Sequence, residues 1–368
     1  MKLPPRKKAV LLLQDGTTFT GNSIGKLGTS GGEICFNTGM TGYQEIYTDP
    51  SYYGQIIVNT TSHIGNYGAL DSEKENDNIS IKGLVVNDFS DIYSRTSATE
   101  SLQEFLEKNN TVGISGLDTR SLVRHIRTKG AMNAIISSEI DGDDLFKKLQ
   151  EVPDMDALEL ATKVTTNETY EVGASNSGYK IAVLDIGVKR SILKNFEKRN
   201  CHCKVFPAET SFSDMKAWNP DGFFISNGPG DPAVMDYAID TTKQILSEDA
   251  PLFGICLGSQ IMAKAVGVGT YKMHHGHRGL NHPVKNLATG LSEITSQNHG
   301  FAVDMDSLNS SKDAELTHID LNDNTVEGLR INGKPAFSVQ YHPESSPGPH
   351  DSTYLFDDFI QLIKEAKK

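Results

Sequence analysis

The stretch Pro251-Leu-Phe-Gly-Ile-Cys-Leu-Gly-Ser-Gln-Ile-Met-Ala-Lys-Ala-Val-Gly267 decides the expected fold of this chain. Its apolar run up to Cys256 predicts a short buried strand, and the residues after Gly258 predict a helix. Gly254 and Gly258 bracket the cysteine in a Gly-x-Cys-x-Gly pattern, the thiol counterpart of a nucleophile elbow. The N–H groups at the start of such a helix favour a thiolate and can bind a developing oxyanion. Taken alone, the pattern is better explained by a buried cysteine between two packing glycines, so the rest of the chain has to decide.

Strands and helices alternate through the second half of the chain. The expected strands are 180–185, 203–206, 222–226, 252–256 and 336–341, and the expected helices are 189–198, 238–247 and 260–266. Alternation with short connections predicts a mostly parallel sheet with helices on both faces, which makes a three-layer α/β domain. Binding sites in such sheets form beyond the carboxyl ends of the strands, so motifs that follow different strands are expected to gather there.

Two further motifs follow strands of this predicted sheet. In Asn227-Gly-Pro-Gly-Asp-Pro232 the glycines allow the backbone to approach a ligand, while the prolines spoil a dinucleotide-binding loop. In His342-Pro-Glu344 the glutamate can hold the imidazole in the tautomer that a base beside a thiolate needs. A plain turn and a solvated His-Glu pair are the alternatives for the two motifs.

Other polar groups near the elbow have weaker signals. Gln260 lies four residues beyond Cys256, one helical turn further on the same face, where its amide can hold a polar substrate. It can equally be an ordinary surface glutamine. The segment 296–301 mixes turn formers with an aromatic residue and is either a contact loop or a simple one. The histidines from His274 to His299 match no standard zinc spacing and have glycines around them, so we expect a loop and no metal site.

The first part of the chain has a different character. Residues 1–150 are rich in Gly, Thr and Tyr and contain short β-branched runs and two amphipathic stretches, which predicts a strand-rich mixed α/β domain. Residues 151–178 are polar and poor in periodic apolar positions, so they are expected to link this domain to a second domain, 179–368.

Composition excludes several classes of function. A net charge of −12 without a Lys/Arg block argues against binding to nucleic acid or to an anionic membrane. The chain has 4 scattered cysteines, which is too few for a disulfide framework and fits a cytoplasmic protein. The basic segment from Lys2 is followed by an apolar run, residues 9–13, that is too short for a signal peptide.

Three motifs in order, 227–232, 254–260 and 340–344, resemble those of class I (triad-type) glutamine amidotransferases. Over nearly its whole length the chain is more similar still to the small, glutamine-hydrolysing chain of carbamoyl-phosphate synthetase. The segments that carry this closer resemblance are 36–45, 48–55, 64–68, 116–120, 185–190, 276–283 and 346–351. Two departures stand out: Ser259 replaces a more usual histidine, and Thr61-Ser-His63 replaces a proline-containing run.

The resemblance implies roles for individual residues. It makes Cys256 the nucleophile, His342 the acid and base, and Glu344 the residue that orients the histidine. It places substrate glutamine against Ser51, Gly228, Gly230, Leu257, Gln260, Asn298, Gly300 and Phe301. The N–H groups of Leu257 and Gly228 would form the oxyanion hole. Because Ser51 comes from the first domain, the implied site lies between the domains.

The resemblance also implies a partner. Ammonia would pass through an internal channel to a separate large chain, which makes carbamoyl phosphate from bicarbonate with ATP and Mg²⁺; this chain itself would need no cofactor. The resemblance does not decide whether such heterodimers assemble into higher oligomers. It also does not decide whether the product is used for arginine synthesis, pyrimidine synthesis or both. The alternatives are a stand-alone cysteine hydrolase, a non-catalytic regulatory subunit, and an amidotransferase for anthranilate or GMP synthesis. The first domain argues against the hydrolase and against the amidotransferase for anthranilate or GMP synthesis.

Overall fold

The chain folds into two compact units that contain both helices and sheets. The computed structural model describes residues 5–176 and 178–368, so the start of the basic segment at Lys2 and one residue of the expected linker lie outside the described residues. One unit comprises Met1–Met155 with His274–Arg278, and the other comprises Asp156–Met273 with Gly279–Lys368. We refer to them as the N-terminal and C-terminal units.

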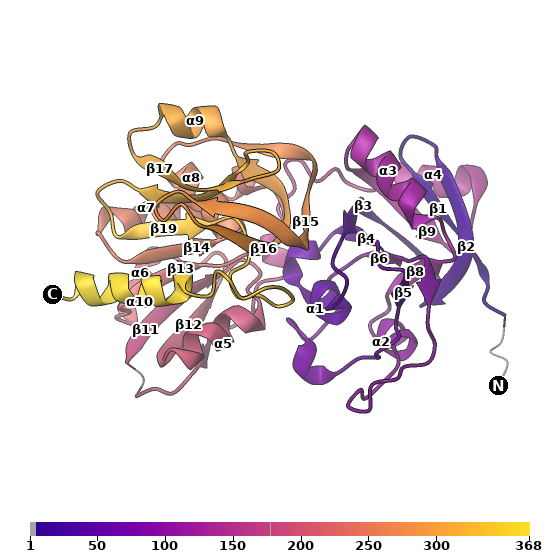
Figure 1. The fold of residues 1–368 in the computed structure, drawn as a ribbon, viewed down its shortest axis with the longest axis horizontal. Coiled ribbons are helices and arrows are strands. Elements are labelled where there is room, and N and C mark those ends of the chain that lie inside the picture. The colour runs from indigo at the N-terminus through magenta and orange to yellow at the C-terminus, as the bar shows by residue number, and fades with distance from the viewer. Residues whose placement is uncertain (1–4, 177) are drawn as a thin grey trace. The chain divides into compact units, whose positions relative to one another are not determined.

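The N-terminal unit is built on a closed barrel with the strand order β1-β2-β8-β6-β4-β3-β9 (Figure 1). The strands are β1 (Lys8–Leu13), β2 (Thr18–Gly25), β3 (Thr29–Asn37), β4 (Gln55–Asn59), β6 (Gly83–Val85), β8 (Val112–Ser115) and β9 (Met132–Ser137). Neighbours from β3 to β8 pair in parallel, and the remaining pairs are antiparallel. Strands β5 (His63–Ile64) and β7 (Asp88–Phe89) form a separate small parallel sheet.

Helices cover this barrel because its strands alternate their apolar side chains. The helices are α1 (Tyr43–Thr48), α2 (Leu102–Lys108), α3 (Thr119–Lys129) and α4 (Gly142–Gln150). In β4, Ile56 and Val58 belong to the same core as α3, whereas Ile57 between them belongs to the core of α1 and α2. Helix α2 begins with a capping box in which Ser101 and Glu104 bond each other's backbone N–H groups.

The C-terminal unit contains a 10-stranded sheet with the order β10-β12-β11-β13-β14-β19-β18-β17-β15-β16. In that order the strands are β10 (Tyr170–Val172), β12 (Cys201–Pro207), β11 (Tyr179–Asp185), β13 (Gly222–Ile225), β14 (Leu252–Ile255), β19 (Ala336–Val339), β18 (Val326–Ile331), β17 (Ala314–Asp320), β15 (Thr270–Asn286) and β16 (Ser292–Val303). The pairs from β12 to β19 are parallel, and the pairs of β10 with β12, β19 with β18, β18 with β17 and β17 with β15 are antiparallel. The expected parallel sheet is therefore its centre, and an antiparallel part extends it beyond β19.

Helices on both faces complete the three layers. The helices are α5 (Arg190–Lys198), α6 (Phe212–Ala217), α7 (Asp236–Ser247), α8 (Leu257–Ala265), α9 (Met305–Ser310) and α10 (Leu355–Ala366). Ile225 packs in one core with α6, α7 and α8, while its neighbour Phe224 packs in the other with α5 and α10. The period of two along β13 thus divides the interior between the two faces.

Three expectations about loops need correction. Residues 296–301 lie in strand β16, and 274–277 lie in strand β15, where we expected loops. Glycine and polar residues made both segments look irregular, but cross-strand pairing in a large sheet overrides such weak local preference. The segment 151–178 is not wholly a linker either, because β10 pairs with β12 and Leu160 and Ala161 are buried.

None of the helices within residues 5–176 and 178–368 combines the length and the apolar character that a membrane span requires.

Candidate active site

Cys256 occupies the sharp turn between strand β14 and helix α8. Its backbone adopts φ 55° and ψ −107°, a combination that non-glycine residues rarely adopt and that costs conformational energy. The backbone is held there because the Cys256 N–H donates to the carbonyl of Val339 in β19, at 2.9 Å. This backbone conformation places the sulfur at the carboxyl end of the parallel strands, as the elbow motif predicts.

The two flanking glycines are required because backbone passes close to both. A Cβ on Gly258 would lie 2.2 Å from the carbonyl oxygen of Ile225 in β13. A Cβ on Gly254 would lie 2.9 Å from the carbonyl carbon of Gly258 and 2.7 Å from the sulfur of Met262. Since real Cβ atoms do not approach backbone this closely, side chains at these positions would push α8 away from the sheet.

His342 and Glu344 follow the end of β19 and form a buried pair. The His342 Nδ1 atom lies 2.7 Å from Glu344 Oε1, and both side chains are almost fully excluded from solvent. Within the described residues no oxygen acceptor pairs with His342 Nε2, which leaves that nitrogen to the sulfur of Cys256. The structure therefore brings together the three residues that the sequence singled out as nucleophile, base and orienting carboxylate.

A buried lysine completes this group. Lys189 Nζ lies 2.8 Å from Glu344 Oε1 and donates a hydrogen bond to the carbonyl of Ser346 at 2.6 Å. It lies at the N-cap of α5, after a loop whose N–H groups at Gly187 and Val188 donate to the carboxylate of Asp185. In the sequence, the segment 185–190 stands out only as part of a resemblance. A lysine four residues beyond the end of β11 was the available signal.

Charge compensation determines the protonation of the pair. Burial lowers the pKa of His342, but the charges of Glu344 and Cys256 outweigh it and raise that pKa to about 10. Burial raises the pKa of Glu344, but the cations of Lys189 and His342 outweigh it and lower that pKa to about 2. At neutral pH the imidazole is thus a cation beside the sulfur, and the carboxylate is ionised.

The loop after β13 lies against the start of α8. A Cβ on Gly228 would lie 1.9 Å from the carbonyl oxygen of Ile186 and 3.1 Å from the Leu257 side chain, so only glycine fits. The N–H groups of Gly228 and Leu257 have no acceptor among the described residues. Two unpaired donors near one strained cysteine are the arrangement that an oxyanion hole requires.

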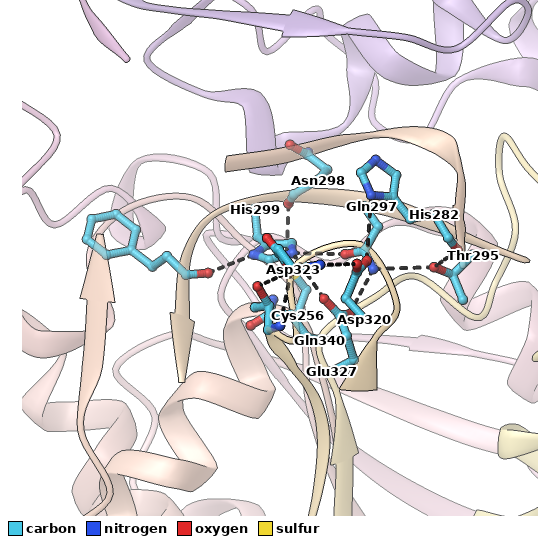
Figure 2. Close-up of polar contacts among 12 residues, drawn as sticks. Cys256, His282, Thr295, Gln297, Asn298, His299, Asp320, Asp323, Glu327 and Gln340 are labelled. Carbon is cyan, nitrogen blue, oxygen red and sulfur yellow. Dashed lines mark hydrogen bonds and ion pairs between the residues drawn. The ribbon is translucent and has the colours of Figure 1, made fainter. Parts of the chain in front are cut away.

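Strand β16 supplies the other side of this group. The thiol of Cys256 donates to the carbonyl of Asn298, with sulfur and oxygen 3.5 Å apart (Figure 2). The amide nitrogen of Gln260 donates to the carbonyl of Phe301 at 2.8 Å and to Gln340 Oε1 at 2.9 Å. Because this nitrogen serves two protein acceptors, a contact of Gln260 with substrate would use its oxygen.

A buried polar network supports β16 from within the C-terminal unit (Figure 2). His299 Nδ1 lies 2.7 Å from the carbonyl of Phe301, and its Nε2 lies 2.8 Å from Gln297 Oε1. Gln297 in turn donates to Glu327 Oε2 at 2.8 Å, which fixes the orientation of its amide. Both ring nitrogens of His299 therefore face acceptors, and the carboxylate of Glu327 lies 3.8 Å from Nε2.

The remaining site residues divide between the two units. Gly230 lies in the loop after β13, and Gly300 lies in β16. Ser51 belongs to the N-terminal unit, where it is buried in a short turn and its N–H donates to Asp49. Its contact with substrate stays a prediction. Glu327 on β18 belongs to no motif and was not predicted from the sequence.

Ser259, the departure from the family pattern beside the nucleophile, has a local partner. Its hydroxyl lies 2.8 Å from that of Ser338 in β19, and both residues are buried. This contact joins α8 to β19. Cys256 and His342 are positioned by the other contacts described above.

Comparisons with known proteins identify the family of both parts of the chain. Residues 182–362 match the family model of class-I glutamine amidotransferases, and residues 11–136 match that of the carbamoyl-phosphate synthase small chain, CPSase domain. The elbow, the buried His-Glu pair and this match define the C-terminal unit as a class-I glutamine amidotransferase domain.

Full-length relatives specify the family further. The chain is 46% identical to a carbamoyl phosphate synthase small chain of Chlorobaculum tepidum over 98% of both proteins. It is 46% identical to that of Thermotoga maritima, covering 98% of this chain and 100% of the relative, and 47% identical to that of Vibrio vulnificus, covering 98% and 99%. The chain belongs to the family of carbamoyl phosphate synthase small chains.

Proposed function

We propose that this chain is the glutaminase subunit of a carbamoyl-phosphate synthetase and that Cys256, His342 and Glu344 carry out the hydrolysis of L-glutamine. The observation that carries this proposal is the buried group itself: a cysteine in a strained elbow, an imidazole cation beside it, and a carboxylate that holds the imidazole. A merely structural cysteine needs neither the strain nor the cation.

The first half of the reaction transfers the acyl group to sulfur. With its proton on His342, the sulfur attacks the side-chain amide carbon of glutamine, and the electron pair of the C=O bond moves onto oxygen. The N–H groups of Gly228 and Leu257 stabilise this oxyanion, and the loss of one such donor typically costs ~3–4 kcal/mol of barrier. His342 Nε2 then gives its proton to the leaving nitrogen, the C–N bond breaks, and ammonia departs.

The second half regenerates the enzyme. Neutral His342 takes a proton from water, and the resulting hydroxide attacks the γ-glutamyl thioester. Collapse of the second tetrahedral species breaks the C–S bond and releases glutamate, which restores the sulfur and the imidazolium. Glu344 keeps Nδ1 of the ring protonated throughout, so that Nε2 is always the nitrogen that exchanges protons.

The synthetase half of the reaction requires a partner. The relatives are named small chains, and no phosphate-binding loop occurs in this sequence, so we infer a separate large chain that consumes the ammonia and uses ATP and Mg²⁺. We propose that ammonia reaches it through an internal channel and that glutamine also contacts Ser51. Four free cysteines fit a reducing compartment, and we infer that the protein is cytoplasmic.

The test is a reconstitution with the purified large chain. We expect release of glutamate from glutamine by the small chain, faster with the large chain than without it, and formation of carbamoyl phosphate only in the complex. Hydrolysis of many unrelated amides by the isolated chain would instead favour a stand-alone hydrolase. The absence of any glutamate release from the complex would refute the proposal.

A further inference from the structure

The segment 156–166, which we call the connector, enters the C-terminal unit along the loops that carry the site. It directly follows the boundary between the two units, at Met155. The connector has little regular structure, yet Leu160 and Ala161 within it are buried, and Ala161 belongs to the core of α7 and α8. The mechanism proposed above uses none of its side chains, so its specific attachments need another explanation.

Its first attachment is to the loop of the oxyanion donor. Asp231, three residues after Gly228, donates its N–H to the carbonyl of Leu158 at 3.0 Å. The carboxylate of Asp231 accepts from the N–H of Ala157 at 2.9 Å and from the N–H of Ala233 at 2.8 Å. Ala157 is held with φ 59°, a left-handed conformation that a flexible alanine would not keep without such a partner.

Backbone contact strengthens this attachment. Glu159 forms an antiparallel bridge with Gly230, and a Cβ on Gly230 would lie 2.7 Å from the carbonyl oxygen of Leu158. The side chain of Glu159 also accepts a hydrogen bond from Tyr237 at the start of α7, at 2.8 Å. The loop is therefore sandwiched, with Ile186 and α8 on one side of Gly228 and the connector against Gly230 and Asp231.

The second attachment is to the loop that leads to Lys189. The hydroxyl of Thr165 donates to the carbonyl of Asp185 at 2.6 Å and accepts from the N–H of Ala208 at 3.0 Å. The N–H of Thr166 donates to the carboxylate of Asp185 at 2.7 Å. The connector is thus hydrogen-bonded both to the loop that leads to Lys189 and to the loop that carries the Gly228 N–H.

We propose that the connector is a positioning element of the glutaminase site: through Asp231 it holds the loop that carries the Gly228 N–H in place for the oxyanion. This inference rests on the proposed function. An oxyanion donor acts on the transition state and hardly on bound glutamine, so a loosened connector slows the chemical step and leaves substrate affinity largely unchanged.

The test compares Asp231→Ala with Thr162→Ala in the complex with the large chain. Thr162 also lies on the connector, but its side chain is exposed and, among the described residues, bonds Glu159 alone, which makes it a matched control. We expect Asp231→Ala to lower kcat for glutamine hydrolysis about tenfold or more, since complete loss of a donor costs about 10²- to 10³-fold. KM for glutamine should change less than about threefold, and Thr162→Ala should match the wild type.

Two further measurements separate positioning from general damage. Ammonia-dependent carbamoyl phosphate synthesis reports a folded complex, and the rate of alkylation of Cys256 by iodoacetamide reports an intact nucleophile; both should be unchanged in Asp231→Ala. If that variant does not fold, Thr165→Val removes the hydroxyl bonds at the second attachment and keeps the shape of the side chain, and kcat should again fall.

An unchanged kcat in Asp231→Ala, or a rise in KM with kcat preserved, would overturn the positioning role. So would an equal loss in Thr162→Ala. The absence of glutamine hydrolysis in the wild-type complex would refute the proposed function itself, which keeps the two failures distinguishable.

Discussion

Four side chains in the C-terminal unit determine the chemistry that the site can perform. Beside Cys256, the side chains of His342, Glu344 and Lys189 form a buried series in which cations and an anion alternate, so the burial cost of each charge is offset by a neighbour of opposite charge. Removing one member leaves another charge buried and uncompensated, which is why single substitutions here are expected to have large effects.

Lys189→Met is the first such substitution. It removes the cation that lies 2.8 Å from Glu344 Oε1 and the hydrogen bond from Lys189 to the carbonyl of Ser346. The carboxylate then binds a proton more readily and orients His342 less well, so we expect kcat/KM for glutamine to fall by about tenfold or more. Steady-state glutaminase assays measure this, with the exposed Lys243→Met as control. Equal activity of the two variants would contradict the role.

The protonation of His342 predicts how stability depends on pH. Its pKa rises from 6.5 to about 10 on folding, so its contribution to the free energy of unfolding is complete below 6.5 and is lost as the pH rises toward 10. The variant His342→Gln lacks this contribution at every pH. Urea unfolding should therefore show a large difference between wild type and variant at about pH 6 and a small one at about pH 9. A difference independent of pH would show that the ring is not a cation in the folded protein.

Strand β14, the elbow and helix α8 act as one element. The glycines of the elbow are fixed by close backbone approach, because Gly258 lies against the carbonyl of Ile225. The position of the sulfur thus depends on how closely α8 can approach β13, and this dependence can be tested separately from the charges.

Gly258→Ala should force α8 away from β13. Overpacking of this kind typically costs about 1–3 kcal/mol of stability, and we expect a lower Tm together with a loss of glutaminase activity. Gly269→Ala is the matched control, because a Cβ there would meet its nearest atoms at 3.5 Å or more. Thermal unfolding and activity of the two variants decide the matter; a Gly258→Ala protein that behaves like the control would disprove the packing argument.

At the scale of the whole molecule, the proposed function assigns ammonia production to the C-terminal unit and carbamoyl phosphate synthesis to a partner chain. Cys256→Ser should therefore abolish glutamine-dependent carbamoyl phosphate formation by the reconstituted pair, since serine is a far weaker nucleophile than a cysteine paired with a histidine. Synthesis from added ammonia should continue at the wild-type rate. Both rates are measured on the same preparation, and a loss of both would contradict the division of labour.

Motifs with a strict steric or chemical requirement were predictable from the sequence. The elbow around Cys256 requires small neighbours, and the alternation of strands and helices requires a parallel sheet, so the class of the C-terminal fold and the position of the elbow followed from local pattern. The role of Cys256 as nucleophile came from the resemblance and stays a prediction. The helix over 189–198 and the strand over 180–185 were likewise confirmed, because their apolar periodicity is strong.

Tertiary structure alone decided what lies beside what. Glu327 on β18 and His299 on β16 have no common motif, and only cross-strand geometry places the carboxylate 3.8 Å from the ring. Lys189 becomes a partner of Glu344 across more than half of the C-terminal unit's sequence, and the connector acquires its attachments by packing rather than by any pattern of its own. The physical reason is that strand pairing, burial and charge compensation join residues that are distant in the chain, whereas local sequence encodes only steric preference and periodicity.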